Sequence, residues 1–327
     1  MNSVEREKFW KALCNIQDDT PEHIQELVST IRPPHYLCRF RSVKESSLQQ
    51  LQENKLYFSS ADYYDDPFDT FIHVDFACIK ALYTIASDNL KTNNPAFKSV
   101  FKIFEPIVGI SAEQFINNLK AEDFDLSSIS ERIKHVRTMI QKILFSICFC
   151  EDELNETLWL KYANNYRGFA LVYDIKDENT LLCGTEDMCK YCKSMSERPY
   201  IYPIYYSENP YDATQYALAC LLREKHLPSQ FLEAIRYASM WQAERISLIK
   251  KKCHEYDKEW RMIRPAMMLE RTCIKMKPHK IILGLKMPEY ERMLVISAAK
   301  IAGIRTVEEL YINDLDQLAS RVYHRTF

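Results

Sequence analysis

Glycine is scarce in this chain: only five of the 327 residues are glycine, and no two of them lie close together. A Walker-type phosphate loop and the dinucleotide fingerprint GxGxxG both need several glycines within one turn, because the backbone must approach the phosphates closely. The sequence therefore excludes both loops in their standard forms. Any nucleotide that this protein binds is held without them.

Long apolar runs and an excess of charge of one sign are missing too. No run of about eighteen apolar residues occurs, so we expect no membrane-spanning helix. The segment Met1–Lys8 is polar and lacks the apolar core of a secretory signal, which favours a cytoplasmic protein. The net charge of −2 gives no overall basic field for nucleic acid, although it leaves room for a local basic cleft. With 47% hydrophobic residues, the chain can bury a sizeable core.

Eleven cysteines are scattered along the chain, and without an export signal we expect reduced thiols. Three of them, Cys183, Cys189 and Cys192, include a C-x-x-C step in a polar stretch. Tetrahedral zinc would need a fourth ligand, and the sequence has neither a second C-x-x-C step nor a His-x-x-x-His pair. We therefore expect no metal and interpret these cysteines as free thiols, with zinc ligation as the alternative.

Hydrophobic periodicity predicts a single α+β domain over residues 1–327. Helical pieces of unequal length separate the strands, which favours α+β over a doubly wound sheet. The helical features that we expect are an N-terminal cap of two short helices in 1–32, a helical insertion at about 75–143 and a long helix near 229–252. Strands are expected at 36–41, 56–58, 143–149, 168–173, 202–206, 259–263 and 280–283.

Two arginines share one face of the first predicted strand. Successive side chains of a strand point to opposite faces, so Arg39 and Arg41 lie opposite to Cys38 and Phe40. Two adjacent guanidiniums cannot be buried without a partner. They require carboxylates, solvent or an anionic ligand, and the guanidinium fork suits a pyrophosphate because it binds two oxygens at once.

A strand late in the chain carries acids that could form ion pairs with these arginines. Asp257 and Glu259 are expected on one face of that strand together with Arg261. Paired acids in this position suit a reaction with a cationic transition state. They are equally candidates for ion pairs with Arg39 and Arg41, and the two interpretations are compatible.

A second group of acids surrounds Pro67. Asp65, Asp66 and Asp69 are typical of a solvated turn, because Asp and Pro both favour turns. The alternative is metal binding, since carboxylates are hard oxygen ligands. We therefore keep Asp66 and Asp69 as candidate metal ligands beside the turn interpretation.

Three aromatic residues recur at helical spacing. Trp159, Tyr162 and Tyr166 share one face of a predicted helix that Asn155 caps. Such a stripe packs into the core in most proteins, and the alternative is a platform on which a ligand stacks. We keep Trp159 and Tyr162 as candidate cofactor contacts.

Taken in chain order, these segments resemble a bacterial family catalogued as domain of unknown function 2971. Its members have an aromatic-Arg-aromatic-Arg-Ser strand, then Leu-Tyr-Phe-Ser-Ser, Asn-Asp-Pro-Phe-Asp, Cys-Phe-Ser-Glu, Trp-x-x-Tyr-Ala with a trailing glycine, and acid-x-Glu-Trp-Arg. The matching segments are Tyr36–Ser42, Leu56–Ser60, Asp65–Asp69, Cys148–Glu151, Trp159–Gly168 and Asp257–Arg261. Two residues depart from this pattern, with Asp65 in place of Asn and Cys150 in place of Ser.

The order of arginine, serine pair and glutamate on three strands is also similar to the Arg-Ser-Glu pattern of ADP-ribosyltransferases. This likeness implies small mixed or split β-sheets around a cleft that binds NAD without a glycine-rich loop. It implies that the Arg holds the phosphates, the Ser supports the nicotinamide side and the Glu stabilises the oxocarbenium-like ribose. In that order, the candidates are Arg39 or Arg41, Ser59 or Ser60, and Glu259 with Asp257 beside it.

The leading hypothesis is therefore an NAD-using ADP-ribosyltransferase-like enzyme, either a transferase or an NAD glycohydrolase, that acts as a bacterial toxin or anti-phage defence effector. NAD is its substrate, and a protein or a nucleic acid is its candidate target. The first alternative is a metal-dependent hydrolase or nuclease using Asp66, Asp69, Asp257 and Glu259, which requires these carboxylates to converge. The second is a non-enzymatic sensor or partner-binding protein, in which the two arginines and the late acids form a closed salt-bridge network.

Overall fold

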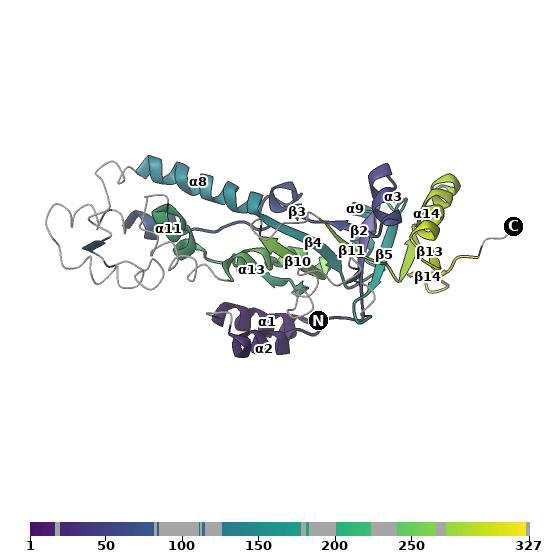
Figure 1. Cartoon of the computed structure of the whole chain (residues 1–327), viewed down its shortest axis with the longest axis horizontal. Coiled ribbons are helices and arrows are strands. Elements are labelled where there is room, and N and C mark those ends of the chain that lie inside the picture. Colours follow the sequence, from purple (N-terminus) through teal and green to yellow (C-terminus); the bar gives the residue numbers. More distant parts are fainter. Residues whose placement is uncertain are drawn as a thin grey trace.

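The computed structural model describes residues 1–16, 20–81, 126–177, 201–223, 241–265 and 273–324, together with residues 84, 111, 113–114 and 181–182. These residues form mixed β-sheets with helices on opposite sides, as Figure 1 shows. The α+β class predicted from the sequence is confirmed.

One large sheet organises the described residues. Nine of the described strands form it in the order β14-β13-β12-β5-β1-β4-β10-β7, with β3 pairing to β4 beside this path. β12 and β13 run parallel, and the other pairs in this sheet are antiparallel. Its strands are β1 (Tyr36–Arg41), β3 (Ser59–Ser60), β4 (Leu144–Cys150), β5 (Phe169–Asp174), β7 (Tyr202–Pro203), β10 (Glu259–Pro265), β12 (Lys280–Leu283), β13 (Thr306–Ile312) and β14 (Leu318–Val322).

Two smaller sheets lie beside it within the described residues. One has the order β2 (Lys55–Tyr57), β11 (Cys273–Met276) and β6 (Leu181–Leu182). The other is a parallel pair of β8 (Tyr205–Ser207) and β9 (Ile249–Lys251). This parallel pair places Lys250 of β9 beside the end of the main sheet.

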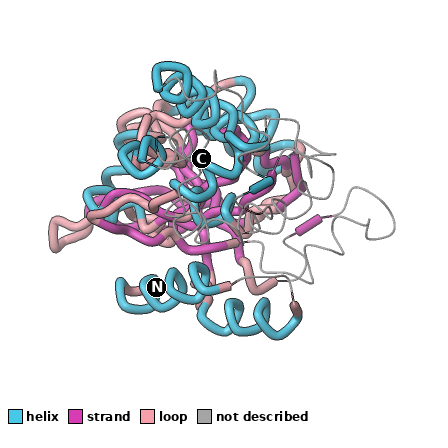
Figure 2. Tube along the Cα trace, turned by 90° about the vertical axis from the view of Figure 1, so that its left-hand side faces the viewer, coloured by secondary structure: helices cyan, strands magenta, loops and turns pink. Residues whose placement is uncertain are grey.

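The helices cover both faces of the main sheet. Figures 1 and 2 show α1 and α2 together on one side of the strands and α8 on the other. None of the described helices combines the length and the apolar character needed to cross a bilayer. The described helices are α1 (Ser3–Asn15), α2 (Pro21–Thr30), α3 (Glu45–Gln52), α8 (Leu126–Ile143), α9 (Glu156–Lys161), α11 (Thr214–Arg223), α13 (Gln242–Ser247) and α14 (Glu289–Ile301), with 3₁₀ turns η1 (Ala61–Tyr63) and η3 (Lys252–Asp257).

Residues at the N-termini of several helices explain where these helices begin. Asn2 accepts a hydrogen bond from the backbone N–H of Glu5, and the Glu5 side chain bonds back to the Asn2 N–H, which forms a capping box for α1. Pro21 opens α2, where its missing N–H costs nothing. Asn155 caps α9 by accepting from the Leu158 N–H, as predicted.

The alternation predicted for β1 is confirmed, and both of its faces reach apolar core. Leu37 belongs to a cluster that includes Phe149 and Trp260 and is covered by residues of α14. Cys38 and Phe40 belong to a second cluster on the other face, around Trp159 of α9. Arg39 and Arg41 share the Leu37 face, where Arg39 is buried and Arg41 is partly buried.

The main sheet is split between β1 and β4. Cys38 and Cys150 are the one residue pair in register between these two strands, both of which lie wholly within the described part. Further along the same edge of β4, β3 takes the place of β1, with Ser59 opposite Ser146. The stretch of β4 between these two pairings, residues 147–149, therefore faces a gap in the sheet.

The N-terminal helices bind tightly to the end of this split sheet. Arg6 of α1 is buried and donates from Nη1 to the backbone carbonyls of Ile204, at 2.7 Å, and Glu259, at 3.0 Å. Its Nη2 also lies 3.2 Å from the Glu151 carboxylate. The two helices predicted for residues 1–32 are confirmed, and they brace β10 where that strand begins.

Two other helical predictions have mixed outcomes. For the insertion at 75–143, α8 is confirmed, with Ile129, Ile133 and Val136 buried along its inner face, and residues 76–81 are also helical. Most of the stretch between them lies outside the described residues.

The long helix near 229–252 is wrong over its second half. Residues 224–240 lie outside the described residues, Trp241 has a left-handed backbone with φ of 62°, α13 ends at Ser247, and β9 follows. Pairing of β9 with β8 outweighs the helical periodicity here.

Candidate ligand-binding site

A cavity of about 420 Å³ opens at the split in the main sheet. Its walls come from β1, β4 and β10, from the segment 63–69 that follows β3, and from α9, β9 and η3. The missing pairing between β1 and β4 explains why side chains from both faces of β1 reach the same space. The volume lies within the range of about 300–1000 Å³ that is typical of small-molecule sites.

Arg39 lines this cavity as a buried cation without a hydrogen-bond partner on two of its nitrogens. The residue is only 9% exposed, and neither Nε nor Nη1 has a partner. Its guanidinium carbon lies 5.6 Å from the centre of the Phe149 ring. Burial, and then the charge of Arg41, lower the pKa of Arg39 to about 9.

Arg41 also lines the cavity, but it is only partly buried and has one hydrogen bond. Its Nη1 donates to the backbone carbonyl of Phe40 at 3.2 Å, and burial lowers its pKa. No described carboxylate forms an ion pair with Arg39 or Arg41. A buried guanidinium without a counter-charge, with a second one beside it, is costly in the free protein, and an anionic ligand would remove that cost.

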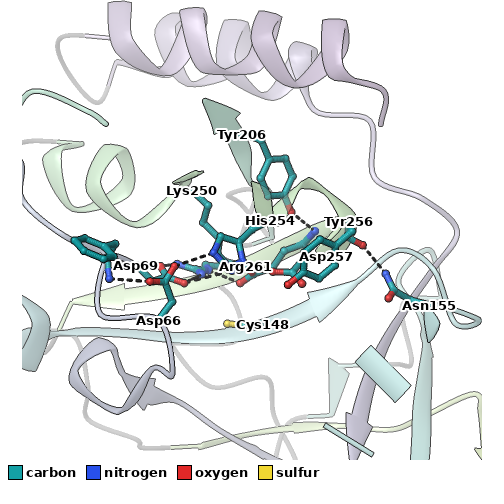
Figure 3. Close-up of polar contacts among 12 residues, drawn as sticks. Asp66, Asp69, Cys148, Asn155, Tyr206, Lys250, His254, Tyr256, Asp257 and Arg261 are labelled. Atoms are coloured by element: carbon teal, nitrogen blue, oxygen red, sulfur yellow. Dashed lines mark hydrogen bonds and ion pairs between the residues drawn. The ribbon is translucent and has the colours of Figure 1, made fainter. Parts of the chain in front are cut away.

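The opposite wall carries a dense ion-pair network, shown in Figure 3. Arg261 is 1% exposed on its side chain and binds Asp69 through two bonds of 2.6 and 2.8 Å and Glu259 through one of 2.5 Å. Lys250 lies 2.9 Å from Glu259, 3.0 Å from Asp257 and 3.5 Å from Asp69. Three carboxylates thus share two cations.

The network keeps its members charged. Burial alone would raise the pKa of Glu259, but the charges of Arg261 and Lys250 outweigh burial and hold that pKa well below its ordinary value. Burial likewise opposes the charge of Lys250, and the carboxylates of Glu259 and Asp69 raise its pKa above the ordinary value. Glu259 is therefore an ionised carboxylate at any physiological pH.

Backbone strain lies directly next to these acids. Lys258, between Asp257 and Glu259, has φ of 44°, and Thr70, directly after Asp69, has φ of 53°. Non-glycine residues rarely adopt this left-handed conformation, and a β-branched residue such as threonine does so least readily. Strain of this kind gathers at functional sites, where the surrounding structure maintains it.

The expected pairing of Arg39 and Arg41 with Asp257 and Glu259 is wrong. Cys38 lies opposite Cys150, and Cys150 lies opposite Glu259, so the acids share the Cys38 face of the sheet and not the Arg39 face. The late acids bind Lys250 and Arg261 instead. The arginines and the acids still line one cavity, because the split opens it to both faces.

The other sequence candidates separate into two groups. Ser59 and Tyr162 line the cavity, and Tyr162 is 43% exposed. Ser60 does not line it: its hydroxyl bonds to the Asp62 carboxylate. Trp159 is wholly buried in the core between Phe40 and Tyr166, so the core interpretation holds and it is no cofactor contact.

Three further residues of the cavity were missed by the sequence argument. Lys250 was hidden by the helix predicted near 229–252, and His254, just beyond that helix, belongs to no sequence pattern that marks it. Cys148 was hidden inside an apolar strand, although the parity of β4 places it opposite Arg261. Burial raises its pKa to about 11, so it stays a neutral thiol.

The cysteines that could have bound zinc, Cys183, Cys189 and Cys192, lie outside the described residues. Among the residues that are described, no group of three or more His, Cys, Asp or Glu side chains is arranged to hold a metal ion. Comparison with protein-family models, with curated proteins and with solved structures gives no match for this chain.

Proposed function

We propose that this protein is an ADP-ribosyltransferase-like enzyme that binds NAD in the cavity and breaks its bond between nicotinamide and ribose. One observation carries the proposal: the guanidinium of Arg39 is buried with Nε and Nη1 unpaired, and it shares a cavity with Arg41 and with the ionised carboxylate of Glu259. The cavity has a cationic end and an anionic end, and NAD itself carries both a pyrophosphate and a cationic nicotinamide ring.

The cationic end suits the pyrophosphate. Arg39 and Arg41 are two residues apart on one strand face, so each guanidinium can meet one phosphate with paired N–H···O bonds. Binding would give both side chains the counter-charge that they lack in the free protein. The chain then needs no glycine-rich loop, in agreement with its five glycines.

The anionic end suits the reacting ribose. Asp69, Asp257 and Glu259 surround Lys250 and Arg261, and this arrangement keeps one net negative charge. When the C1′–N bond breaks, its electron pair leaves with nicotinamide and the positive charge moves to the ribose. A fixed, buried carboxylate stabilises that developing charge more than it stabilises the ground state.

The metal-dependent hydrolase has weaker support. Its carboxylates do converge, but cationic side chains already engage them. Asp69 binds Arg261, Glu259 binds Arg261 and Lys250, and Asp257 binds Lys250. Two-metal chemistry needs carboxylates that are free to ligate.

A nucleotide sensor is the second candidate function, and one observation favours it. Both carboxylate oxygens of Glu259 already accept charged hydrogen bonds, Oε1 from Arg261 and Oε2 from Lys250. A carboxylate held in this way can be a fixed part of a binding site as readily as it can be a catalytic group. Binding is common to both functions, and turnover separates them.

The experiment measures NAD binding by calorimetry and nicotinamide release by chromatography. For the wild type we expect saturable NAD binding and release of nicotinamide. Glu259→Gln should keep affinity for ADP-ribose, which has no bond to cleave, and lose about 10²–10³-fold in release, as for loss of one electrostatic stabiliser. The matched control is Glu309→Gln, because Glu309 also bridges two cationic side chains, Arg292 and Arg321, but does not line the cavity. If the wild type neither binds nor consumes NAD, the proposal fails; binding without release establishes the sensor.

The proposal extends to a toxin or anti-phage effector that acts in the cytoplasm on NAD, with water, a protein or a nucleic acid as acceptor. Expression of the wild type in a bacterial host should lower the cellular NAD level and slow growth. Expression of Glu259→Gln at the same level should do neither.

A further inference from the structure

One histidine stands at the cavity between the two acidic groups predicted from the sequence. His254 belongs to η3, and its side chain is 21% exposed, so it is held in place and still open to the cavity. Its Nε2 lies 3.2 Å from Asp66 Oδ2, and its Nδ1 lies 3.9 Å from Asp257 Oδ2. The two ring nitrogens therefore have different surroundings.

The Asp66 side is fixed. Asp66 Oδ1 accepts a hydrogen bond of 2.9 Å from the Phe68 N–H, and the Asp66 carbonyl accepts one of 3.0 Å from the Asp69 N–H. This turn leaves Oδ2 directed at His254. A carboxylate held in this way assigns the proton of a neutral imidazole to Nε2 and leaves a lone pair on Nδ1.

The Asp257 side is open. A separation of 3.9 Å is too long for a hydrogen bond between Nδ1 and the carboxylate. An oxygen atom seated beside both groups could donate to one of them while the other orients it. Asp257 is itself held by Lys250 at 3.0 Å. The position of such an oxygen atom is therefore defined by two fixed groups, His254 and Asp257.

We infer that His254 is the general base that activates the acceptor hydroxyl, with Asp66 as its positioning residue. The inference rests on the proposed function. A water molecule or a substrate hydroxyl seated beside both Nδ1 and Asp257 would give its proton to Nδ1 as its oxygen bonds to C1′. The C1′–N bond breaks, nicotinamide leaves with the electron pair, and the imidazolium later returns the proton to solvent. The acceptor class is thus an oxygen nucleophile.

The charges around His254 suit this role. Asp66 meets its ring from the turn and Asp257 from its own element, while Asp65, Glu259 and the cations Lys250 and Arg261 line the same cavity. Asp66, at 3.2 Å from Nε2, is the direct counter-charge for an imidazolium that forms during the reaction.

The test compares His254→Ala with a matched histidine variant. His35→Ala is the control, because His35 Nε2 also binds an aspartate, Asp174, at 3.0 Å but lies outside the cavity. We expect His254→Ala to bind ADP-ribose with unchanged affinity and to lose about 10²–10⁴-fold in kcat for nicotinamide release. Added imidazole should restore part of this loss, since the cavity of about 420 Å³ has room for the ring that was removed. The control should change neither quantity.

Each outcome decides the assignment. An active wild type with an equally active His254→Ala variant overturns the role of His254 and leaves the proposed function standing. A variant that loses ADP-ribose affinity together with turnover, and that imidazole does not rescue, makes His254 a structural residue. A wild type that binds ADP-ribose but releases no nicotinamide overturns the proposed function and the role of His254 together.

Discussion

Arg39 and Arg261 are both buried arginines of one cavity, but their surroundings are opposite. Arg261 has two carboxylates and a backbone carbonyl as partners, and every one of its nitrogens is bonded. Arg39 has no partner on Nε or Nη1 and rests on the face of Phe149. A buried charge that has its partners is compatible with a stable fold, whereas a buried charge without a partner lowers the stability of the free protein. This difference is the basis for our proposal that Arg39 binds a ligand, whereas Arg261 holds the ion-pair network together.

The largest effect is expected for Arg261, the arginine whose charge is paired. Arg261→Met leaves three buried carboxylates, Asp69, Asp257 and Glu259, with Lys250 as their one remaining cation within the network, which costs about 3–5 kcal/mol in the free energy of unfolding. Urea unfolding followed by circular dichroism measures this. A loss below about 1 kcal/mol would mean that the network rearranges easily, and the contrast with Arg39 would disappear.

Substitution of Arg39, the unpaired arginine, should change the free energy of unfolding in the opposite direction. Arg39→Met removes a charge that nothing neutralises, so we expect the free energy of unfolding to rise by about 1–3 kcal/mol. The same variant should lose the thermal stabilisation that ADP-ribose gives to the wild type. Arg264→Met is the control, because Arg264 is equally buried and lies over the ring of Phe58, but outside the cavity. If Arg39→Met is less stable than the wild type, Arg39 is a structural residue.

The smallest effect is a change in ligand affinity with pH. In the free protein the pKa of Arg39 is lowered to about 9, whereas a bound phosphate favours the protonated guanidinium and raises that pKa again. Binding therefore takes up a proton once the pH exceeds about 9, and affinity should be flat below that pH and fall above it, by up to tenfold per unit. Calorimetry with ADP-ribose from pH 7 to 10.5 tests this, because its phosphates keep their charge throughout. An affinity that stays constant to pH 10.5 contradicts it.

Sequence reasoning succeeded where the relevant rule is local. Strand parity placed Arg39 and Arg41 on one face, and a capping residue placed the start of α9. It failed where the answer depends on register across the sheet. The partner of Asp69 lies nearly two hundred positions away, and no local pattern states that Arg261 will meet it. Lys250 was missed because helical periodicity competed with a strand pairing that only the folded chain provides.

The single pairing between β1 and β4 also has a mechanical consequence. It joins one half of the sheet, which carries Arg39 and Arg41, to another half, which carries Glu259. Bending at this junction would disturb few hydrogen bonds, so we expect the main sheet to bend most easily here. A dinucleotide that binds residues of both halves of the sheet would restrict bending at this junction. Slower amide exchange on both flanks of the junction would then report occupancy of the cavity.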